Sequence, residues 1–365
     1  FMDQSEITNN EYRQFVDWVE DSIIRSGLNM YQTDRKDTLK MKSKIGKRNK
    51  IVDFNARATN DTSFQYYRDS IFVKAWVDGK EVMNKEAFIY VHEEVDYRSL
   101  SADRVNDPQI IDALTAEQFR EKYVIKREVV IYPNTLDFQG DFVYSHEETE
   151  AEYNFLHEAY DDYPVVGITW DQANAFCHWR THVYNQFLAA NNEPLVPDFR
   201  LPTETEWEYA ARGGLDQSPY PWGGPSTRNS RGCFLANFKP MRGNYSADGG
   251  HKAIKVQQYN PNNYGLYDMA GNVAEWTSTV YDETSGSYTS DMDGDNSNLG
   301  GNFDINNPDG NVPIQRKVTR GGSWKDVAFF IQTSTRTYEY SDESNSYIGF
   351  RCVMDFLGRD QKDFK

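Results

Sequence analysis

The first hydrophobic pattern of the chain lies close to its beginning. Apolar side chains recur there with the spacing of one helical face, at Tyr12, Phe15, Val16, Val19 and Ile23. Thr8 and Glu11 precede this pattern and have the spacing of a capping box, in which the hydroxyl and the carboxylate close the first turn of a helix. The sequence therefore predicts a helix that begins after Thr8 and ends near Gly27.

The same helix-start signal returns twice in the second half of the chain. Thr169 and Gln172 form a second capping box, and Thr203 and Glu206 form a third. An apolar helical pattern follows each box, and Gly213 is placed to end the third helix in a left-handed conformation. Just before the second box, the apolar residues 165–168 predict a short buried strand.

Residues 28–160 show a different pattern from the rest of the chain. Short apolar runs at 71–73 and 129–132 predict strands, and residues 116–126 predict a helix between them. A structureless loop of this length is implausible inside a compact domain, so we expect small structures of its own. The expected organisation is a first helix in residues 1–27, an insertion at 28–160, the remainder of the domain at 161–356 and a tail at 357–365.

A further motif closes the domain. It begins Arg320-Gly321-Gly322-Ser323-Trp324, which is typical of a strand that runs into a tight glycine turn. It ends Gly349-Phe350-Arg351-Cys352, which predicts a last strand.

Charge and composition exclude some functions. The 365 residues carry 39 Lys and Arg against 56 Asp and Glu, a net charge of -17, which is the wrong sign for a nucleic-acid-binding protein. No apolar run approaches the roughly 18 residues that a membrane-spanning helix needs. One segment has the opposite charge, with eight basic residues at Arg35, Lys36, Lys40, Lys42, Lys44, Lys47, Arg48 and Lys50. It is either a solvated loop or a contact with an acidic partner or a lipid surface.

The chain has three cysteines, Cys177, Cys233 and Cys352. Their spacing indicates neither a zinc knuckle nor a redox dithiol. One disulfide with a spare thiol and three small buried side chains are both compatible with this spacing.

Several motifs, in this order, resemble the formylglycine-generating-enzyme (sulfatase-modifying factor) family. They lie at residues 5–9, 164–170, 177–179, 200–214, 220–223, 236–237, 264–276, 320–324 and 349–352. The resemblance covers roughly residues 1–20 and 160–355. It implies an α+β fold with little regular secondary structure, related in shape to C-type lectins, with a large insertion after the first helix.

The resemblance also bears on catalysis. Enzymes of this family oxidise a substrate cysteine with two cysteines of their own, which hold copper and lie just after the Gly-Gly-Ser turn. The matching positions in this chain are Asp326 and Ile331. Neither side chain can supply a thiolate to copper(I). We therefore expect no copper and no catalytic residues of this kind, so that the chain is not an enzyme.

Other features of the family carry over as expectations. A disulfide would join Cys177 to Cys352, leaving Cys233 free. One calcium site would use the side chains of Asp268 and Glu275 with the backbone oxygens of Gly271 and Val273.

A second calcium site would also follow from the resemblance. It would use the side chains of Asn237 and Asp248, with backbone oxygens near Phe238 and Gly250. At both sites, the alternative is a turn held by its Asx side chains alone.

Within the family, the first-helix motif and the large insertion look like the gliding-motility lipoproteins of the GldK/PorK type. This resemblance implies a structural subunit of a homo-oligomeric ring of the type IX secretion machinery. It would bind a GldN/PorN-type partner and other secretion-machine proteins in the periplasm. The chain begins in mid-pattern at Phe1, so we expect a lipid-bearing N-terminal segment that tethers it to the outer membrane. Two alternatives are a calcium-dependent ligand- or glycan-binding module and an enzyme of this fold with different chemistry, such as an iron-dependent sulfoxide synthase.

Overall fold

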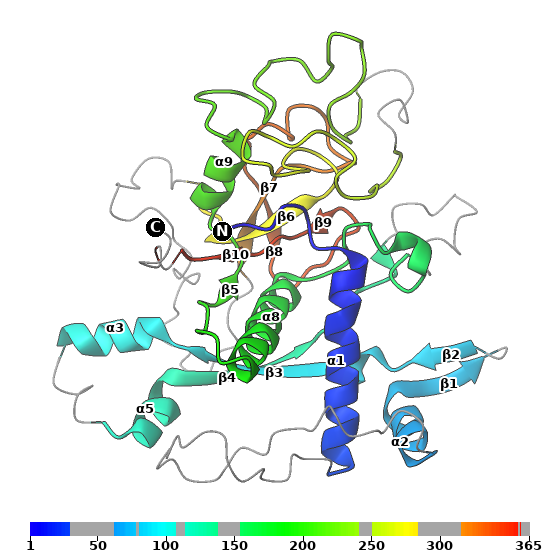
Figure 1. The fold of residues 1–365 in the computed structure, drawn as a ribbon, viewed down its shortest axis with the longest axis vertical. Helices are drawn as coiled ribbons and strands as arrows, with labels where there is room; N and C mark the ends of the chain where they lie inside the picture. The colour runs from blue at the N-terminus through cyan, green and yellow to red at the C-terminus, as the bar shows by residue number, and fades with distance from the viewer. Residues whose placement is uncertain are drawn as a thin grey trace. The chain divides into compact units, whose positions relative to one another are not determined.

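The computed structural model describes residues 1–29, 62–77, 80–106, 114–137, 154–240, 250–283, 315–356 and 358. The chain divides into two compact units (Figure 1). The first unit comprises Phe1–Arg13 and Pro133–Lys365, and the second comprises Gln14–Tyr132. The division therefore lies inside the first helix rather than at the expected boundaries of 28 and 160.

The first helix, α1 (Asn9–Gly27), begins and ends where the sequence predicts. The Thr8 amide donates to the Glu11 carboxylate at 2.8 Å, and the Glu11 amide donates to the Thr8 hydroxyl at 3.3 Å. These two bonds are the capping box, which satisfies amides that have no partner inside the helix.

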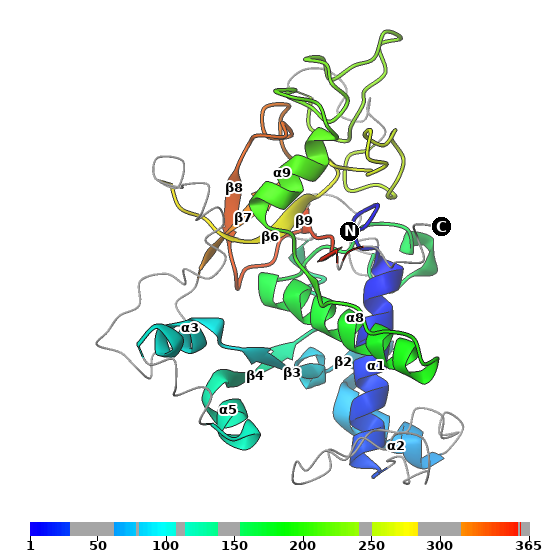
Figure 2. The ribbon, with the colours of Figure 1, turned by 60° about the vertical axis from the view of Figure 1, so that its left-hand side comes forward.

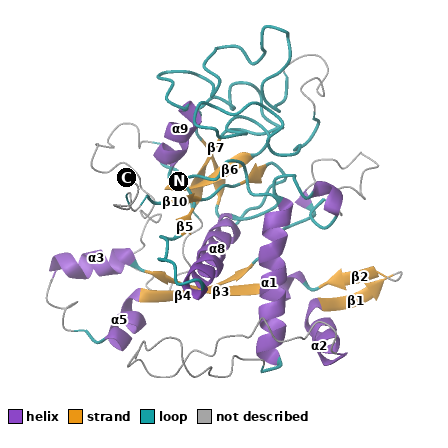
Figure 3. Cartoon of the chain, in the orientation of Figure 1, coloured by secondary structure: helices purple, strands orange, loops and turns teal. Residues whose placement is uncertain are grey.

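The second unit contains two small antiparallel sheets (Figure 3). Its further elements are α2 (Thr62–Phe72), β1 (Val73–Val77), β2 (Lys80–Met83), η1 (Lys85–Ala87), β3 (Ile89–Val95), α3 (Tyr97–Asn106), α5 (Ala116–Tyr123) and β4 (Val124–Val130). β1 pairs with β2, and β3 pairs with β4. Aromatic rings fill its interior, with the Phe72 and Phe88 centroids 4.6 Å apart and those of Phe15 and Tyr90 5.2 Å apart.

Two predictions for this unit are corrected. The run at 71–73 is not a strand, because Phe72 ends α2 and only Val73 begins β1. The predicted helix at 116–126 ends at Tyr123, and the strand β4 starts directly after it. At residues 71–73 and 124–126, a short apolar run is compatible with the end of a helix and with a strand. Hydrophobicity alone therefore did not distinguish these two structures.

The first unit combines helices with short strands joined by long loops, and its class is α+β. Its elements are η2 (Glu158–Tyr160), α8 (Trp170–Ala190), β5 (Phe199–Arg200), α9 (Glu204–Arg212), β6 (Ala274–Val280), β7 (Arg316–Arg320), β8 (Thr337–Tyr340), β9 (Ile348–Gly349) and β10 (Val353–Met354). The strand order of its main sheet is β8-β7-β6-β9, in which only β6 and β9 run parallel. α9 packs against β6 and β7 (Figure 2), and β5 pairs with β10.

Both predicted helices of this unit are confirmed, with their caps. Thr169 accepts from the Gln172 amide at the start of α8, and Thr203 accepts from the Glu206 amide at the start of α9. Gly213 ends α9 with a φ of 56°, the left-handed conformation that glycine adopts with least strain.

The predicted strand at residues 165–168 is wrong, although these residues are buried. Gly167 has a φ of 70°, which no extended strand allows. Its amide donates to the Asn345 carbonyl oxygen at 3.0 Å. The Val165 amide donates to the Ile7 carbonyl oxygen at 2.9 Å, and Thr8 and Pro164 form an isolated bridge, but the described residues of this segment belong to no strand. The segment is a buried irregular turn.

The core of the first unit joins the two ends of the chain. Tyr12, Phe176 and Phe350 are all buried, and their rings lie 5.3 to 6.4 Å apart. The Ile7 amide donates to the Phe350 carbonyl oxygen at 2.9 Å, so the first residues run beside the last strands. Among the helices in the described ranges, none is both long and apolar enough to cross a bilayer.

Candidate functional site

The glycine turn after β7 forms as predicted, and Asp326 closes it. Gly321 and Gly322 have φ values of 88° and 64°. The Asp326 carboxylate accepts from the Ser323 amide at 2.9 Å and from the Ser323 hydroxyl at 2.7 Å. This carboxylate therefore holds together the turn on which it lies.

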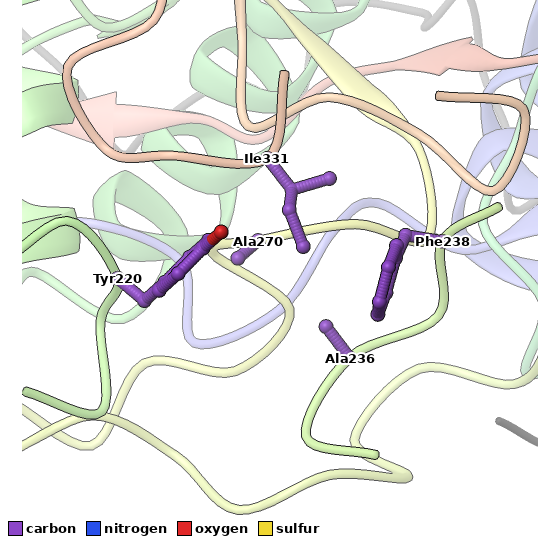
Figure 4. Packing of buried hydrophobic residues seen from close by; sticks show 5 residues of the cluster. All are labelled: Tyr220, Ala236, Phe238, Ala270 and Ile331. Atoms are coloured by element: carbon purple, nitrogen blue, oxygen red, sulfur yellow. The ribbon is translucent and has the colours of Figure 1, made fainter. Parts of the chain in front are cut away.

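Ile331 is a core residue. Its side chain has no exposed surface and packs among Tyr220, Ala236, Phe238 and Ala270 (Figure 4). Burial of an aliphatic side chain of this size contributes about 1.5–3 kcal/mol to folding. Ile331 therefore contributes to core packing and presents no polar or nucleophilic group.

A buried ion pair lies beneath the turn. Arg351 Nη2 and Nε donate to the two carboxylate oxygens of Glu275, each at 2.6 Å, and neither side chain has exposed surface. The Trp207 indole donates to the same carboxylate at 2.7 Å. The resemblance predicts Glu275 as a calcium ligand, but in the structure its oxygens accept hydrogen bonds from a guanidinium and an indole.

Two more carboxylates lie in this buried region. Glu6 accepts from the Asn272 side chain at 2.7 Å and from the Val273 amide at 3.1 Å. Asp268 accepts from the Gln257 amide at 2.7 Å and is 8% exposed. Glu6 was not among the predicted site residues, because its partners Asn272 and Val273 lie 266 and 267 residues away in the sequence.

Burial perturbs the pKa values of both groups, and neighbouring negative charges add to its effect. Burial raises the pKa of Asp268 to about 6, against the opposing effects of the Gln257 amide and the charge of Arg351. Burial, with the negative charges of Asp268 and Glu275, also raises the pKa of Glu6 well above its usual value. Three carboxylates interact here with the one guanidinium of Arg351, an imbalance that a bound cation would relieve.

The second candidate calcium site lies around Asn237. This residue is 1% exposed, and its Nδ2 donates to the Lys252 carbonyl at 2.9 Å and to the Asn272 side chain at 3.2 Å. Its Oδ1 is buried and accepts no hydrogen bond from the described residues. A Cβ atom on Gly250 would lie 3.4 Å from Asn237 Nδ2, so these two expected ligands are neighbours. Asp248 lies outside the described residues.

The Cys177 and Cys352 sulfur atoms lie 3.3 Å apart, and both residues are fully buried. The structure therefore brings the two expected partners of the disulfide together. Burial raises the pKa of the Cys352 thiol well above its usual value. Cys233 is exposed and separate from them. The eight basic residues at 35–50 lie outside the described residues.

Comparisons with known proteins give consistent relatives. The sulfatase-modifying factor enzyme 1-like domain matches residues 1–356. Inactive C-alpha-formylglycine-generating enzyme 2 of Mus musculus is 33% identical over 206 residues, which are 55% of this chain and 51% of that protein. Formylglycine-generating enzyme of the same species is 28% identical over 291 residues, 77% of this chain and 66% of that protein.

A bacterial relative and a solved structure extend this set. Formylglycine-generating enzyme of Streptomyces coelicolor is 31% identical over 198 residues, 53% of each chain. The structure of Treponema denticola variable protein 1 aligns with 54% of this chain and 73% of that chain, at 26% identity and a TM-score of 0.38. The chain spans between 51% and 66% of the length of the three formylglycine-generating-enzyme relatives named here.

The raised pKa of Asp268 predicts a pH-dependent stability. Its folded-state pKa of about 6 exceeds the usual 3.8. The contribution of its protonated form to the free energy of unfolding is therefore fully present below pH 3.8 and is lost as the pH rises through 6. The loss amounts to at most about 3 kcal/mol. Asp268→Asn should therefore unfold at higher denaturant than the wild type at pH 7.5 and nearly together with it at pH 4. Asp216→Asn, at an exposed position, is the control, and equal pH profiles for all three proteins would contradict the prediction.

The disulfide remains a prediction of the resemblance, and counting thiols tests it. In the unfolded, unreduced protein, one reactive thiol is expected if Cys177 and Cys352 are bonded, because only Cys233 remains. Cys233→Ser should then give none. Three thiols in the wild type and two in the variant would exclude the bond. A bond that closes so long a loop would stabilise the fold by about 4–5 kcal/mol in the chain-entropy model.

Proposed function

This chain belongs to the sulfatase-modifying factor enzyme 1-like domain family, and we propose that it is a non-catalytic member that acts as a structural subunit of a larger assembly. The observation that carries the proposal is the chemistry of two positions. Asp326 and Ile331 stand where the resemblance places the two copper-binding cysteines. A carboxylate and an alkyl group can neither bind copper(I) as a thiolate nor exchange electrons with a cysteine.

The surroundings of Asp326 and Ile331 support the proposed non-catalytic role. Asp326 is engaged by Ser323 within its own turn, and Ile331 belongs to a core cluster. The three cysteines of the chain do not replace the missing pair, because Cys177 and Cys352 are buried against each other and Cys233 is alone. The mouse relative that matches 55% of this chain is itself named as inactive.

The finer proposal concerns the assembly. The first-helix motif and the long segment after it look like those of the GldK/PorK-type lipoproteins, so we place the chain in a periplasmic ring of the type IX secretion machinery. Its partner there would be of the GldN/PorN type, and a lipid anchor would hold it at the outer membrane. The second unit supports a role in contacts, because Gln14–Tyr132 is a compact unit with its own aromatic interior. Insertions on a rigid core commonly carry interactions.

A calcium-dependent binding module is the second candidate, and one observation favours it. The buried Oδ1 of Asn237 accepts no hydrogen bond from the described residues, and an oxygen in this position is what calcium requires. Asn237, Phe238 and Gly250 would hold the ion with Asp248. At the other site, Asp268, Gly271 and Val273 would be the ligands with Glu275. Calcium would fix the loops that carry these residues.

Thermal unfolding with and without calcium tests this second candidate. If Asn237 binds the ion, adding calcium at pH 7.5 should raise the unfolding temperature of the wild type by mass action. Asn237→Leu should remove most of this shift, and Asn185→Leu on α8 should keep it. Magnesium should have a smaller effect, because it demands shorter bonds and a stricter geometry. An equal shift in the wild type and in Asn237→Leu would reject the Asn237 site.

Native mass and activity test the structural role. The protein solubilised from its own membrane should run as a particle of many copies together with a second protein in fixed ratio. The purified chain should form no aldehyde from a cysteine peptide in the presence of copper and oxygen, whereas an active member of the family assayed in parallel should form it. A free monomer would reject the assembly, and aldehyde formation or bound redox-active iron would reject the non-catalytic role.

A further inference from the structure

The second unit carries a ribbon of two strands, β3 and β4, with α3 and α5 at one end of it (Figure 3). Neither strand pairs with a further strand in the described part of the chain. One face of the ribbon packs on α1, where the Tyr90 ring lies 5.2 Å from Phe15 and 6.3 Å from Trp18. The other face is open, with Ile89 39% and Val91 50% exposed. A ribbon of only two strands is marginally stable by itself, and a third strand would extend its apolar face.

The hydrogen-bond pattern of the ribbon shows which backbone groups face outward. The Ile131 amide donates to the Phe88 carbonyl oxygen at 2.9 Å, directly before the register in which Ile89 lies opposite Val130. Bonded and non-bonded pairs alternate along an antiparallel ladder. The residues of β3 whose N–H and C=O groups point away from β4 are therefore Ile89, Val91 and Glu93. Within the described ranges, no backbone hydrogen bond reaches these outward groups.

The other strand edges in the described ranges are short, interrupted or guarded. β5, β9 and β10 have two residues each, β2 has four, and a bulge interrupts β1. β4 carries Lys126 and Glu128 along its outer edge. In β8, the Tyr340 amide already donates to the Glu339 carboxylate at 3.1 Å. Short strands, bulges and charged side chains are the usual protection of an edge. β3 is seven residues long, and only Glu93 among its outward residues is charged.

We propose that the outer edge of β3 binds an extended segment of a partner polypeptide as a third, antiparallel strand. Its outward donors and acceptors recur at every second residue, which an extended backbone matches. The partner segment would carry β-branched or aromatic side chains opposite Ile89 and Val91, because these side chains would share the open apolar face. The ribbon already contains one such pair, since Val130 lies opposite Ile89 and is 40% exposed on the same face.

A second copy of this chain fits the edge less well than a different polypeptide. If two β3 strands paired antiparallel about Val91, the Glu93 carboxylate of each copy would lie opposite Ile89 of the other, on the apolar face. Each copy also has a net charge of -17, so two whole chains repel each other. In the cell, the segment would belong to another protein of the proposed assembly, and this part of the inference rests on the proposed function.

Binding of synthetic peptides to the purified chain tests the proposal. The probe is an acetylated and amidated peptide of alternating valine and glutamine, as long as β3, with a lysine added at each end for solubility. By NMR titration at physiological ionic strength, it should bind with a Kd of about 10 µM to 1 mM. Methylation of the valine backbone nitrogens removes the donors that face β3 and should weaken binding at least about tenfold. Methylation of the glutamine backbone nitrogens, which face away, should change binding by less than about threefold.

Variants of the two edges of the ribbon locate the site. Val91→Pro removes an outward amide and leaves the ladder with β4 intact, so it should weaken binding of the probe at least about tenfold. Glu128→Pro is the matched control, because Glu128 lies opposite Val91 and its amide faces away from β3; it should leave binding unchanged. Val91→Lys keeps the amide and adds a charge that guards the edge. It should weaken binding severalfold and tests the same edge if the proline variant unfolds.

Several results would overturn the proposal. They are equal binding of the two methylated peptides, equal effects of Val91→Pro and Glu128→Pro, and no binding of the probe. A dimer of the purified chain that Val91→Pro dissociates would also overturn it, because a second copy would then occupy the edge. Failure of the assembly is distinguishable from failure of this site. A free monomer from the membrane would reject the assembly and leave peptide binding, whereas a native particle without peptide binding would reject only the edge site.

Discussion

The first unit depends on one buried ion pair. Arg351 and Glu275 have no exposed surface, and a charge in this position is tolerated only when it is fully paired. The guanidinium also donates to the backbone oxygens of Asp3 and Tyr267, and the carboxylate accepts from Trp207 on α9. Four distant parts of the sequence, around residues 3, 207, 267–275 and 351, therefore meet at a single pair. Removing one partner of such a pair costs about 3–5 kcal/mol, which is a large part of the stability of a domain.

Around this pair, the backbone is held by side chains rather than by long strands. Asp268, Gly271 and Asn272 all have positive φ values, between 57° and 78°. Asn272 alone contacts four segments. Its side chain donates to Glu6 and accepts from the Ile254 amide, its amide donates to the Asn237 carbonyl, and its carbonyl accepts from the Trp324 amide. Buried backbone amides that have no hydrogen-bond partner in a helix or strand must bond to other groups. These bonds fix the loops. The same arrangement buries Glu6 and Asp268, which raises their pKa values, and the negative charges of neighbouring carboxylates raise them further.

Local signals were sufficient for the helices and insufficient for the site. The caps at Thr203 and Gly213 could be predicted because the bonds that define a helix end join residues three or four positions apart. The irregular turn at Gly167 could not, because its amide bonds to Asn345, far along the chain. Glu6 was missed for the same reason. Its partners are 266 and 267 residues away, and no periodicity records such contacts.

The interactions that stabilise this fold do not depend on cysteines at positions 326 and 331, where the resemblance places those of the family. The ion pair and the glycine turn are built from residues other than Asp326 and Ile331, and Asp326 only adds bonds to a turn that glycine already allows. Catalytic thiols must remain accessible, which leaves a gap in packing, and sites of this kind are commonly destabilising. Ile331 fills its position with apolar volume and buries it completely.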